Sequence, residues 1–240
     1  MPSTSSSRLM KRGALVVLEG VDRSGKSTQC KMLKDTLNNQ GHSVELFRFP
    51  ERSTAIGKVI ADYLAKKCEL DDHAVHLLFS ANRWELMPDL KKHIENGTTV
   101  IVDRYAYSGA AFTAAKPGFS LDWCKQADVG LPRPDLVLFL TLTPEQAARR
   151  GGFGDERYEQ TDFQKRVAAN YSKLSGEDNW KMIDADKDID TLHTELTQLI
   201  TSTIAATKSS GLGTLWTPAS DCSGSPVKEK TRLGQEEALV

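Results

Sequence analysis

Short runs of apolar residues alternate along the chain with longer segments in which apolar residues recur every three or four positions. The short runs are typical of buried strands, and the longer pattern is typical of helices that cover a sheet. Five such runs are present, at residues 14–19, 43–49, 98–103, 136–142 and 181–184. Their alternation with helices predicts an α/β fold in three layers, with a five-stranded parallel sheet flanked by helices.

Several helix boundaries are marked by residues with suitable chemistry. Gly41 is suited to end the helix after the first run, because glycine adopts the left-handed conformation that follows many helices. Asp71 or Asp72 can cap the start of a long helix, which we expect Pro88 to bend or interrupt because proline lacks an N–H donor. A last helix over residues 189–204 carries an apolar stripe on one face.

The charges of the chain nearly cancel, since 31 basic and 32 acidic residues leave a net charge of −1. This balance argues against broad binding to nucleic acid or to a membrane surface, which needs a large basic surplus. No apolar run approaches the roughly 18 residues of a membrane-spanning helix. The 4 cysteines are too scattered for a zinc site and too few for a disulfide scaffold. We therefore expect reduced thiols in an intracellular, cytoplasmic protein, with nucleus or mitochondrion as alternatives.

The two ends of the chain differ in composition from the middle. Residues 1–12 are rich in serine and contain no acid, while residues 217–240 are rich in Ser, Pro, Gly and charge with little to bury. We therefore expect two disordered tails around one domain, residues 13–216.

Residues 20–28, with the sequence GVDRSGKST, match the phosphate-binding loop pattern and follow a predicted strand. Gly20 and Gly25 allow the backbone to turn tightly, so that successive amide N–H groups converge on a triphosphate. Lys26 can bring a positive charge to the outer phosphates, and Ser27 can offer a hydroxyl to Mg²⁺. The loop predicts a P-loop protein that binds a nucleoside triphosphate.

Polar residues also follow the second and third predicted strands, at positions 50–52 and 103–105. The carboxyl ends of parallel strands meet at one edge of a sheet, so these residues should face the same crevice as the loop. No Asn-Lys pair occurs in the chain, which argues against a GTPase. Arg52, Arg83 and Arg104 instead favour an acceptor that already carries a phosphate, because two anions held in line need several cations.

Five segments together carry a family resemblance. They occur in the family's order and approximate spacing, at residues 19–28, 49–52, 78–85, 103–109 and 156–159. With these segments the chain resembles the thymidylate kinase family, in its animal-type branch, over residues 13–216. The resemblance implies that the protein phosphorylates dTMP to dTDP with ATP and Mg²⁺, in dTTP biosynthesis, and that it forms a homodimer. A kinase for another pyrimidine nucleotide or nucleoside, and a silent nucleotide-binding regulator, remain alternatives.

The resemblance also implies roles for residues on the donor side. Asp103 would hold Mg²⁺ beside Ser27, and Arg23 would bridge the donor and acceptor phosphates. The implied catalytic residues are Arg23, Lys26, Asp103 and Arg104. The implied ATP-binding residues are Gly20, Asp22, Arg23, Ser24, Gly25, Lys26, Ser27, Thr28 and Arg150.

On the acceptor side the resemblance implies a phosphate clamp and a base pocket. Arg52 and Arg104 would hold the phosphate, while Asp22 would accept a hydrogen bond from the sugar 3′-hydroxyl. Phe79 would stack on thymine, Arg83 would read its carbonyl edge, and Tyr105 would crowd the 2′ position. The implied dTMP-binding residues are Asp22, Arg52, Phe79, Arg83, Arg104, Tyr105, Ser108, Phe112, Tyr158 and Gln164.

A glycine-rich segment at about residues 149–160 resembles the family's mobile lid over ATP. Its glycines would give it hinge freedom, and its closure would exclude water that could otherwise take the phosphoryl group. Asp155 departs from expectation, because it places an acid in a lid that approaches phosphates. With Arg23 supplying the catalytic cation from the loop, the lid would act mainly as a cover.

Overall fold

The computed structural model describes residues 12–143, 146, 157–158, 160–176, 178–207 and 210–217. Its centre is a 5-stranded sheet with the strand order β2-β3-β1-β4-β5, in which every neighbouring pair is parallel. The strands are β1 (Leu15–Gly20), β2 (Val44–Arg48), β3 (Thr99–Asp103), β4 (Leu136–Thr141) and β5 (Trp180–Asp184). Each lies within two residues of a predicted run, so the predicted fold class is confirmed.

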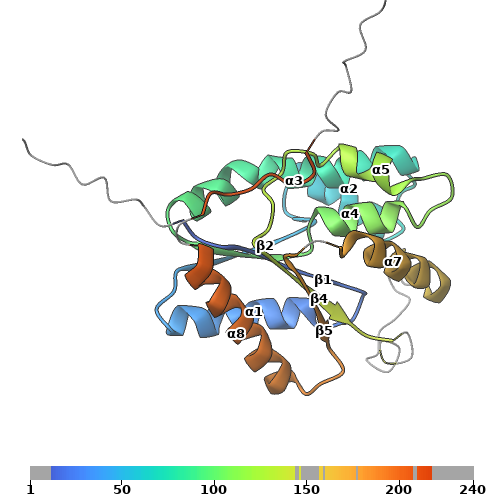
Figure 1. Ribbon diagram of the computed structural model, residues 1–240. Coiled ribbons are helices and arrows are strands. Elements are labelled where there is room, and N and C mark those ends of the chain that lie inside the picture. The colour runs from blue at the N-terminus through green and yellow to red at the C-terminus, as the bar shows by residue number, and fades with distance from the viewer. Residues whose placement is uncertain are drawn as a thin grey trace, which may run out of the picture.

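Helices cover both faces of this sheet, which gives the three predicted layers (Figure 1). The helices are α1 (Lys26–Asn39), α2 (Ala55–Leu64), α3 (Asp72–Glu95), α4 (Ala106–Thr113), α5 (Leu121–Gln126), α7 (Thr161–Leu174) and α8 (Ile189–Thr207). In Figure 1, α1 and α8 lie on one face, while α3, α4 and α7 lie on the other. Two separate clusters of buried apolar side chains match these two faces. Burying both faces is what an all-parallel sheet requires.

The ends of the long helix α3 are set by local chemistry. Asp71 caps it, because its carboxylate accepts hydrogen bonds from the backbone N–H of His73 at 2.9 Å and of Ala74 at 3.3 Å. The helix runs on through Pro88 without a break, contrary to an interruption at that residue. Buried Met87 and Leu90 flank the proline and pack into the core, which offsets the hydrogen bond that proline cannot make.

The last helix, α8, shows a shift in the stripe that the sequence predicted. Leu192, Leu196 and Ile204 are buried as expected. Ile189, the first residue of the helix, is 49% exposed. The core stripe therefore starts one turn later than the periodicity suggested.

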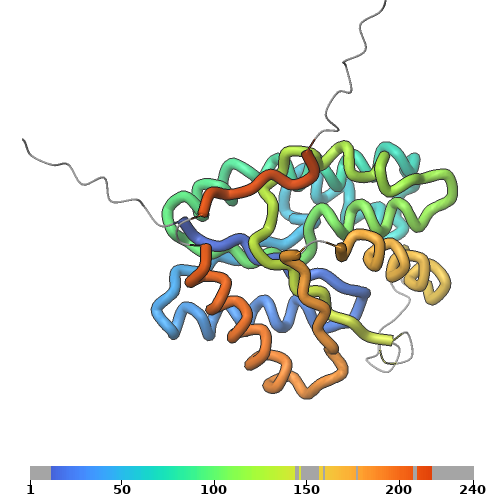
Figure 2. The backbone as a smooth tube through the Cα atoms, in the orientation of Figure 1, coloured from blue at the N-terminus to red at the C-terminus, as the bar shows by residue number. Residues whose placement is uncertain are grey.

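After α8 the chain crosses back to the opposite face (Figure 2). The carbonyl oxygen of buried Leu215 accepts a hydrogen bond from the Gly130 N–H at 3.0 Å, and the Leu215 N–H donates to the Leu131 carbonyl oxygen at 2.7 Å. The Trp216 ring packs edge-on against Tyr107, with 5.6 Å between ring centroids. Apart from residues 12, 157, 158, 160 and 217, the predicted tails and lid lie outside the described residues.

Candidate active site

Two cavities lie at the carboxyl ends of the strands, one on each side of the loop after β1. The loop needs unusual backbone geometry, since Gly20, Arg23 and Gly25 have φ angles of 144°, 67° and 91°. A Cβ on Gly20 would lie 2.4 Å from the carbonyl oxygen of Leu140, so only glycine fits there. Gly25 is also the N-cap of α1, which aims the unpaired N–H groups of that helix at the first cavity.

This first cavity, which we call the donor cavity, is lined by the loop and by residues that follow β5. The predicted loop residues that line it are Arg23, Ser24, Gly25, Lys26, Ser27 and Thr28. Lys187 and Ile189 close its far side, and the sequence reading missed them. Ile189 is an apolar residue that is exposed at the start of α8, and this exposure marks it as part of the cavity wall. Arg150, predicted to bind ATP, lies outside the described residues.

Lys26 is buried in the loop and faces several charged groups. Its Nζ donates to the carbonyl oxygen of Val21 at 2.7 Å and to Ser24 Oγ at 3.2 Å. Burial, and then the positive charge of Arg104, lower the pKa of Lys26 to about 8, although nearby carboxylates of Asp22 and Asp103 oppose the shift. A phosphate in this cavity would favour the charged amine and restore an ordinary pKa.

We therefore expect the affinity for ATP to fall as the pH rises above about 8. Below that pH Lys26 is already charged, whereas above it ATP binding must take up a proton, so affinity should drop by up to about tenfold per pH unit. Calorimetric titrations of ATP between about pH 7 and 9.5 would measure this slope. A Lys26→Met variant should bind weakly with no such slope, and the same slope in both proteins would contradict the assignment.

Ser27, which lines the donor cavity, contacts Asp103 at the end of β3. Ser27 Oγ donates to Asp103 Oδ2 at 2.5 Å, and the Asp103 side chain is only 5% exposed. A hydroxyl and a carboxylate offer the hard oxygen atoms that Mg²⁺ prefers, and Mg²⁺ completes such a shell with phosphate and water. The two residues therefore fit the ion predicted for them. The described residues contain no cluster of three or more His, Cys, Asp or Glu side chains suited to a metal.

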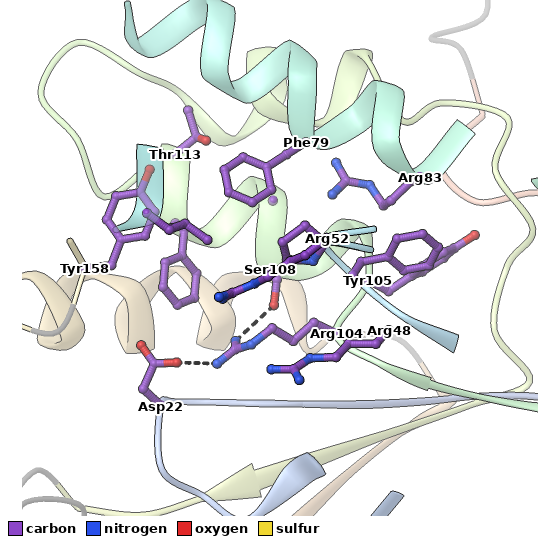
Figure 3. A pocket seen from close by; sticks show the side chains of 15 residues that line it. Asp22, Arg48, Arg52, Phe79, Arg83, Arg104, Tyr105, Ser108, Thr113 and Tyr158 are labelled. Carbon is purple, nitrogen blue, oxygen red and sulfur yellow. Dashed lines mark hydrogen bonds and ion pairs between the residues drawn. The ribbon is translucent and has the colours of Figure 1, made fainter. Parts of the chain in front are cut away.

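The second cavity, which we call the acceptor cavity, is lined by residues that follow β1, β2 and β3 (Figure 3). Nine of the predicted dTMP-binding residues line it: Asp22, Arg52, Phe79, Arg83, Arg104, Tyr105, Ser108, Phe112 and Tyr158. Asp22 therefore lines the acceptor cavity rather than the donor cavity. The tenth residue, Gln164, lies behind the cavity and donates to Asp22 Oδ2 at 2.8 Å and to the Tyr158 carbonyl oxygen at 2.9 Å.

Arg104 is held firmly on the floor of the acceptor cavity. Its guanidinium forms an ion pair with Asp22 and a hydrogen bond to Ser108 Oγ at 3.3 Å, and its backbone has a φ of 69°. Burial alone would lower its pKa, but the surrounding groups Asp22, Tyr171, Glu19 and Asp103, with Asp22 the strongest of them, together outweigh burial and raise the pKa of Arg104 above its usual value. Arg104 therefore stays charged at all relevant pH values and presents a fixed cation to the cavity.

Aromatic rings form one side of the acceptor cavity. Phe79 and Phe112 line it, and the guanidinium of Arg104 lies 5.4 Å from the centroid of the Phe112 ring. Tyr158 packs edge-on against Phe112 at 5.6 Å and stacks on Phe163 at 5.2 Å. Flat apolar faces of this kind suit a planar base.

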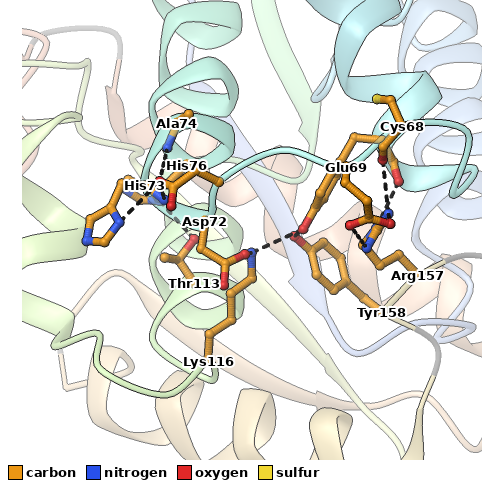
Figure 4. Close-up of polar contacts among 12 residues, drawn as sticks. Cys68, Glu69, Asp72, His73, Ala74, His76, Thr113, Lys116, Arg157 and Tyr158 are labelled. Carbon is orange, nitrogen blue, oxygen red and sulfur yellow. Dashed lines mark hydrogen bonds and ion pairs between the residues drawn. The ribbon is translucent and has the colours of Figure 1, made fainter.

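Tyr158 is itself anchored by a network outside the cavity (Figure 4). Its neighbour Arg157 binds both carboxylate oxygens of Glu69, at 2.9 and 2.7 Å, and lies 4.2 Å above the Tyr63 ring. Lys116 lies 5.3 Å from the centroid of the Tyr158 ring. These contacts fix Tyr158 near the end of the predicted lid, where the described chain resumes.

Arg83 has a partner that the sequence did not reveal. It is 2% exposed and forms a two-pronged ion pair with fully buried Asp128, at 2.9 Å from Nε and 2.5 Å from Nη2. Ser80 Oγ donates to the same carboxylate at 2.8 Å. A Cβ on Gly109 would lie 2.8 Å from Arg83 Nη2, so glycine makes room for the guanidinium beside the cavity. Asp128 thus holds Arg83 in place on the wall of the acceptor cavity.

Tyr105 occupies a rigid position at the end of β3. It is fully buried, lines the acceptor cavity, and donates its hydroxyl hydrogen bond to the Pro132 carbonyl oxygen at 3.2 Å. Because the ring cannot move aside, it can limit the space beside a sugar.

Glu19 is a buried carboxylate that the sequence reading did not assign to the site. It accepts hydrogen bonds from the Tyr105 N–H at 2.8 Å, from Ser108 Oγ at 2.6 Å and from the Tyr171 hydroxyl at 2.8 Å. A buried charge is tolerated only with such partners. Glu19 therefore ties β1 to α4 and fixes the wall of the acceptor cavity. An acid inside an otherwise apolar run was the signal that could have revealed it.

Comparison with known proteins gives one consistent family. The family model described as Thymidylate kinase matches residues 18–196. The chain is 55% identical over 208 residues to the thymidylate kinase of Homo sapiens, covering 86% of this chain and 98% of that protein. It is 51% identical over 208 residues to the Danio rerio thymidylate kinase, with the same coverage. A solved structure of thymidylate kinase from Candida albicans superimposes with a TM-score of 0.78 at 39% identity, covering 85% of this chain and 99% of that one.

Proposed function

The chain belongs to the thymidylate kinase family, and from this premise we propose that its two cavities hold ATP and dTMP end to end. The protein phosphorylates dTMP to dTDP, a step of nucleotide biosynthesis, and family membership implies that ATP is the donor. The observation that supports the arrangement is the shared boundary of the cavities. Arg48 lines both cavities, whereas Lys26 and Ser27 line only the donor cavity and Arg104 lines only the acceptor cavity.

On the donor side, the loop binds the triphosphate and orients its outer phosphate. The N–H groups at the start of α1 and the amine of Lys26 face that phosphate, and Arg23 lines the same cavity. Phosphoryl transfer leaves little covalent work for a protein, so positioning and charge stabilisation supply the rate enhancement. Gly20 and Gly25 contribute by giving the loop its shape. Arg150 and the lid keep their predicted roles as a contact and cover for ATP.

On the acceptor side, Arg104 and Arg52 clamp the phosphate of dTMP, and Asp22 accepts the sugar hydroxyl. Phe79 stacks on the base, and Tyr105 stands beside the 2′ position. Arg83, fixed by Asp128, donates to the carbonyl edge of thymine. The remaining predicted contacts, Ser108, Phe112, Tyr158 and Gln164, complete the pocket. Their support is their position on the cavity wall or directly behind it.

Mg²⁺ would be held by Ser27 and Asp103, whose oxygen atoms fit it. When bound, the ion would shield the charge of the triphosphate and fix its geometry.

We also propose that two copies associate, as the family resemblance implies. Large apolar side chains of Leu77, Trp84 and Trp123 are exposed on α3 and α5. An exposed group of this kind is typical of a protein interface. Sedimentation velocity would show a dimer if the proposal holds. In the described part of the chain, no helix is long and apolar enough to cross a membrane. The cytoplasmic location stays a prediction.

A panel of acceptors tests the arrangement, with ADP release as the readout. We expect kcat/KM for thymidine to be at least about a hundredfold below that for dTMP, because thymidine lacks the phosphate that Arg52 and Arg104 would hold. Turnover of dUMP and dCMP measures how strictly the base is read. Thymidine used as well as dTMP would contradict the acceptor clamp, and ATP binding without turnover of any acceptor would favour a silent regulator.

A further inference from the structure

Arg48, the last residue of β2, occupies a special place between the two cavities. Among the residues that the structure describes, it alone lines both the donor cavity and the acceptor cavity. In Figure 3 its side chain extends in the same direction as that of Arg104, towards the Asp22 side of the acceptor cavity. The sequence reading gave Arg48 no role, because it treated the residue as part of a strand.

The backbone of Arg48 is fixed, while its guanidinium is accessible. Arg48 is paired in register with Asp103 of β3, and the next N–H, that of Phe49, donates to the Asp103 carbonyl oxygen at 3.0 Å. Its side chain is 61% exposed and approaches the Asp103 carboxylate only loosely, at 3.7 Å from Nε to Oδ2. A loose, exposed ion pair contributes little to stability. The guanidinium can therefore turn from Asp103 to a ligand at small cost.

Electrostatic repulsion between the two substrates is greatest at the junction of the cavities. A triphosphate and a monophosphate must meet there, and their negative charges repel each other. Lys26 and Arg23, the residue predicted to bridge the phosphates, line only the donor cavity, and Arg104 lines only the acceptor cavity. The planar guanidinium of an arginine can donate to two phosphate groups at once through its separate N–H groups.

We propose that Arg48 is a catalytic residue that binds the transferring phosphoryl group and bridges the two nucleotides. The inference rests on the proposed assignment of the cavities. In the transfer, a phosphate oxygen of dTMP forms a bond to the γ-phosphorus of ATP while the bond to the β-phosphate oxygen breaks. ADP leaves with that electron pair, and Arg48 keeps its proton throughout. Its contribution is greatest when both nucleotides are present.

Arg48→Met and Arg48→Lys test this proposal, with Arg133→Met as a matched control. Arg133 lines neither cavity and pairs with exposed Asp178 at the opposite edge of the sheet. At saturating ATP and dTMP, kcat of Arg48→Met should fall by about tenfold to a hundredfold, and Arg48→Lys should recover part of it. Arg133→Met should keep the kcat of the unmodified protein. Equal thermal unfolding midpoints would show that all variants are folded.

A second measurement, of binding affinity, distinguishes direct bridging by Arg48 from an indirect effect in which Arg48 restrains Asp103. The probes are dTMP alone, a non-hydrolysable ATP analogue alone, and a dinucleotide in which adenosine and thymidine are joined by a chain of phosphates. Arg48→Met should raise the Kd of each of the three probes. The factor for the dinucleotide should be about tenfold larger than the product of the factors for the two separate nucleotides.

Two results would overturn the proposed role of Arg48, and one further variant tests the cavity assignment itself. A kcat within about twofold of the unmodified protein would overturn the proposal. A fall in kcat without the excess loss of dinucleotide affinity would also overturn it, because Arg48 would then act by restraining Asp103. Failure of the cavity assignment is distinguished by Arg104→Ala, which must weaken dTMP alone if the acceptor cavity is correctly assigned.

Discussion

Replacement of Lys26 by alanine should lower kcat by about a hundredfold or more. The amine is the only lysine nitrogen of the described loop, it is buried, and it is held by Val21 and Ser24 at the floor of the donor cavity. Charge that develops on the outer phosphate during transfer meets this buried amine, and electrostatic stabilisation by a buried charge is strong. Rapid-quench measurement of a single turnover would separate this effect from product release.

Arg23→Ala should show a loss of similar size, because Arg23 lines the same cavity and faces the same phosphates. Thermal unfolding should change little for Arg23→Ala, since its side chain belongs to the loop rather than to the core. Near-normal single-turnover rates in both variants would contradict catalysis by loop cations. An increased KM for ATP with unchanged kcat would show that these residues contribute only to substrate binding.

Replacement of Asp128 by alanine should destabilise the protein by about 3–5 kcal/mol. The change would leave the buried guanidinium of Arg83 without its two hydrogen bonds to Asp128. An uncompensated buried charge is costly because no water replaces the lost partner. Urea unfolding of the unmodified protein and of the variant would give the difference.

The double variant Arg83→Met, Asp128→Leu separates stability from recognition. It removes both charges, so it should recover most of the stability that Asp128→Ala loses. It should not recover dTMP recognition, and its preference for dTMP over dCMP should fall as in Arg83→Ala. Asp178→Ala, which breaks the exposed pair with Arg133, should leave the urea midpoint almost unchanged. If the double variant discriminated between dTMP and dCMP normally, Arg83 would have only a structural role.

The parts of the fold that could be predicted are those that depend on residues close together in the sequence. The five strands follow from continuous apolar runs, and the start of α3 follows from Asp71 beside a helical pattern. The phosphate-binding loop follows from glycines at fixed spacing. Pro88 shows the limit of such local rules, because packing of the residues around it outweighs its missing hydrogen bond.

The parts that could not be predicted depend on contacts between distant residues. Arg83 and Asp128 are 45 positions apart, and nothing in the sequence pairs them. Glu19 receives donors from residues 86 to 152 positions away. The site of Arg48 between two cavities exists only because β2 lies beside β3 in the sheet. Residue types could therefore suggest the chemistry of the site, while the supports of those residues required the fold.

A crystal structure of the protein with dTMP and a non-hydrolysable ATP analogue tests the central arrangement most directly. We predict that the dTMP phosphate contacts Arg52 and Arg104, that the triphosphate contacts Lys26, and that the facing phosphates meet beside Asp103. Density for the pyrimidine nucleotide elsewhere than in the cavity lined by Phe79 and Arg104, with that cavity left open, would contradict the account.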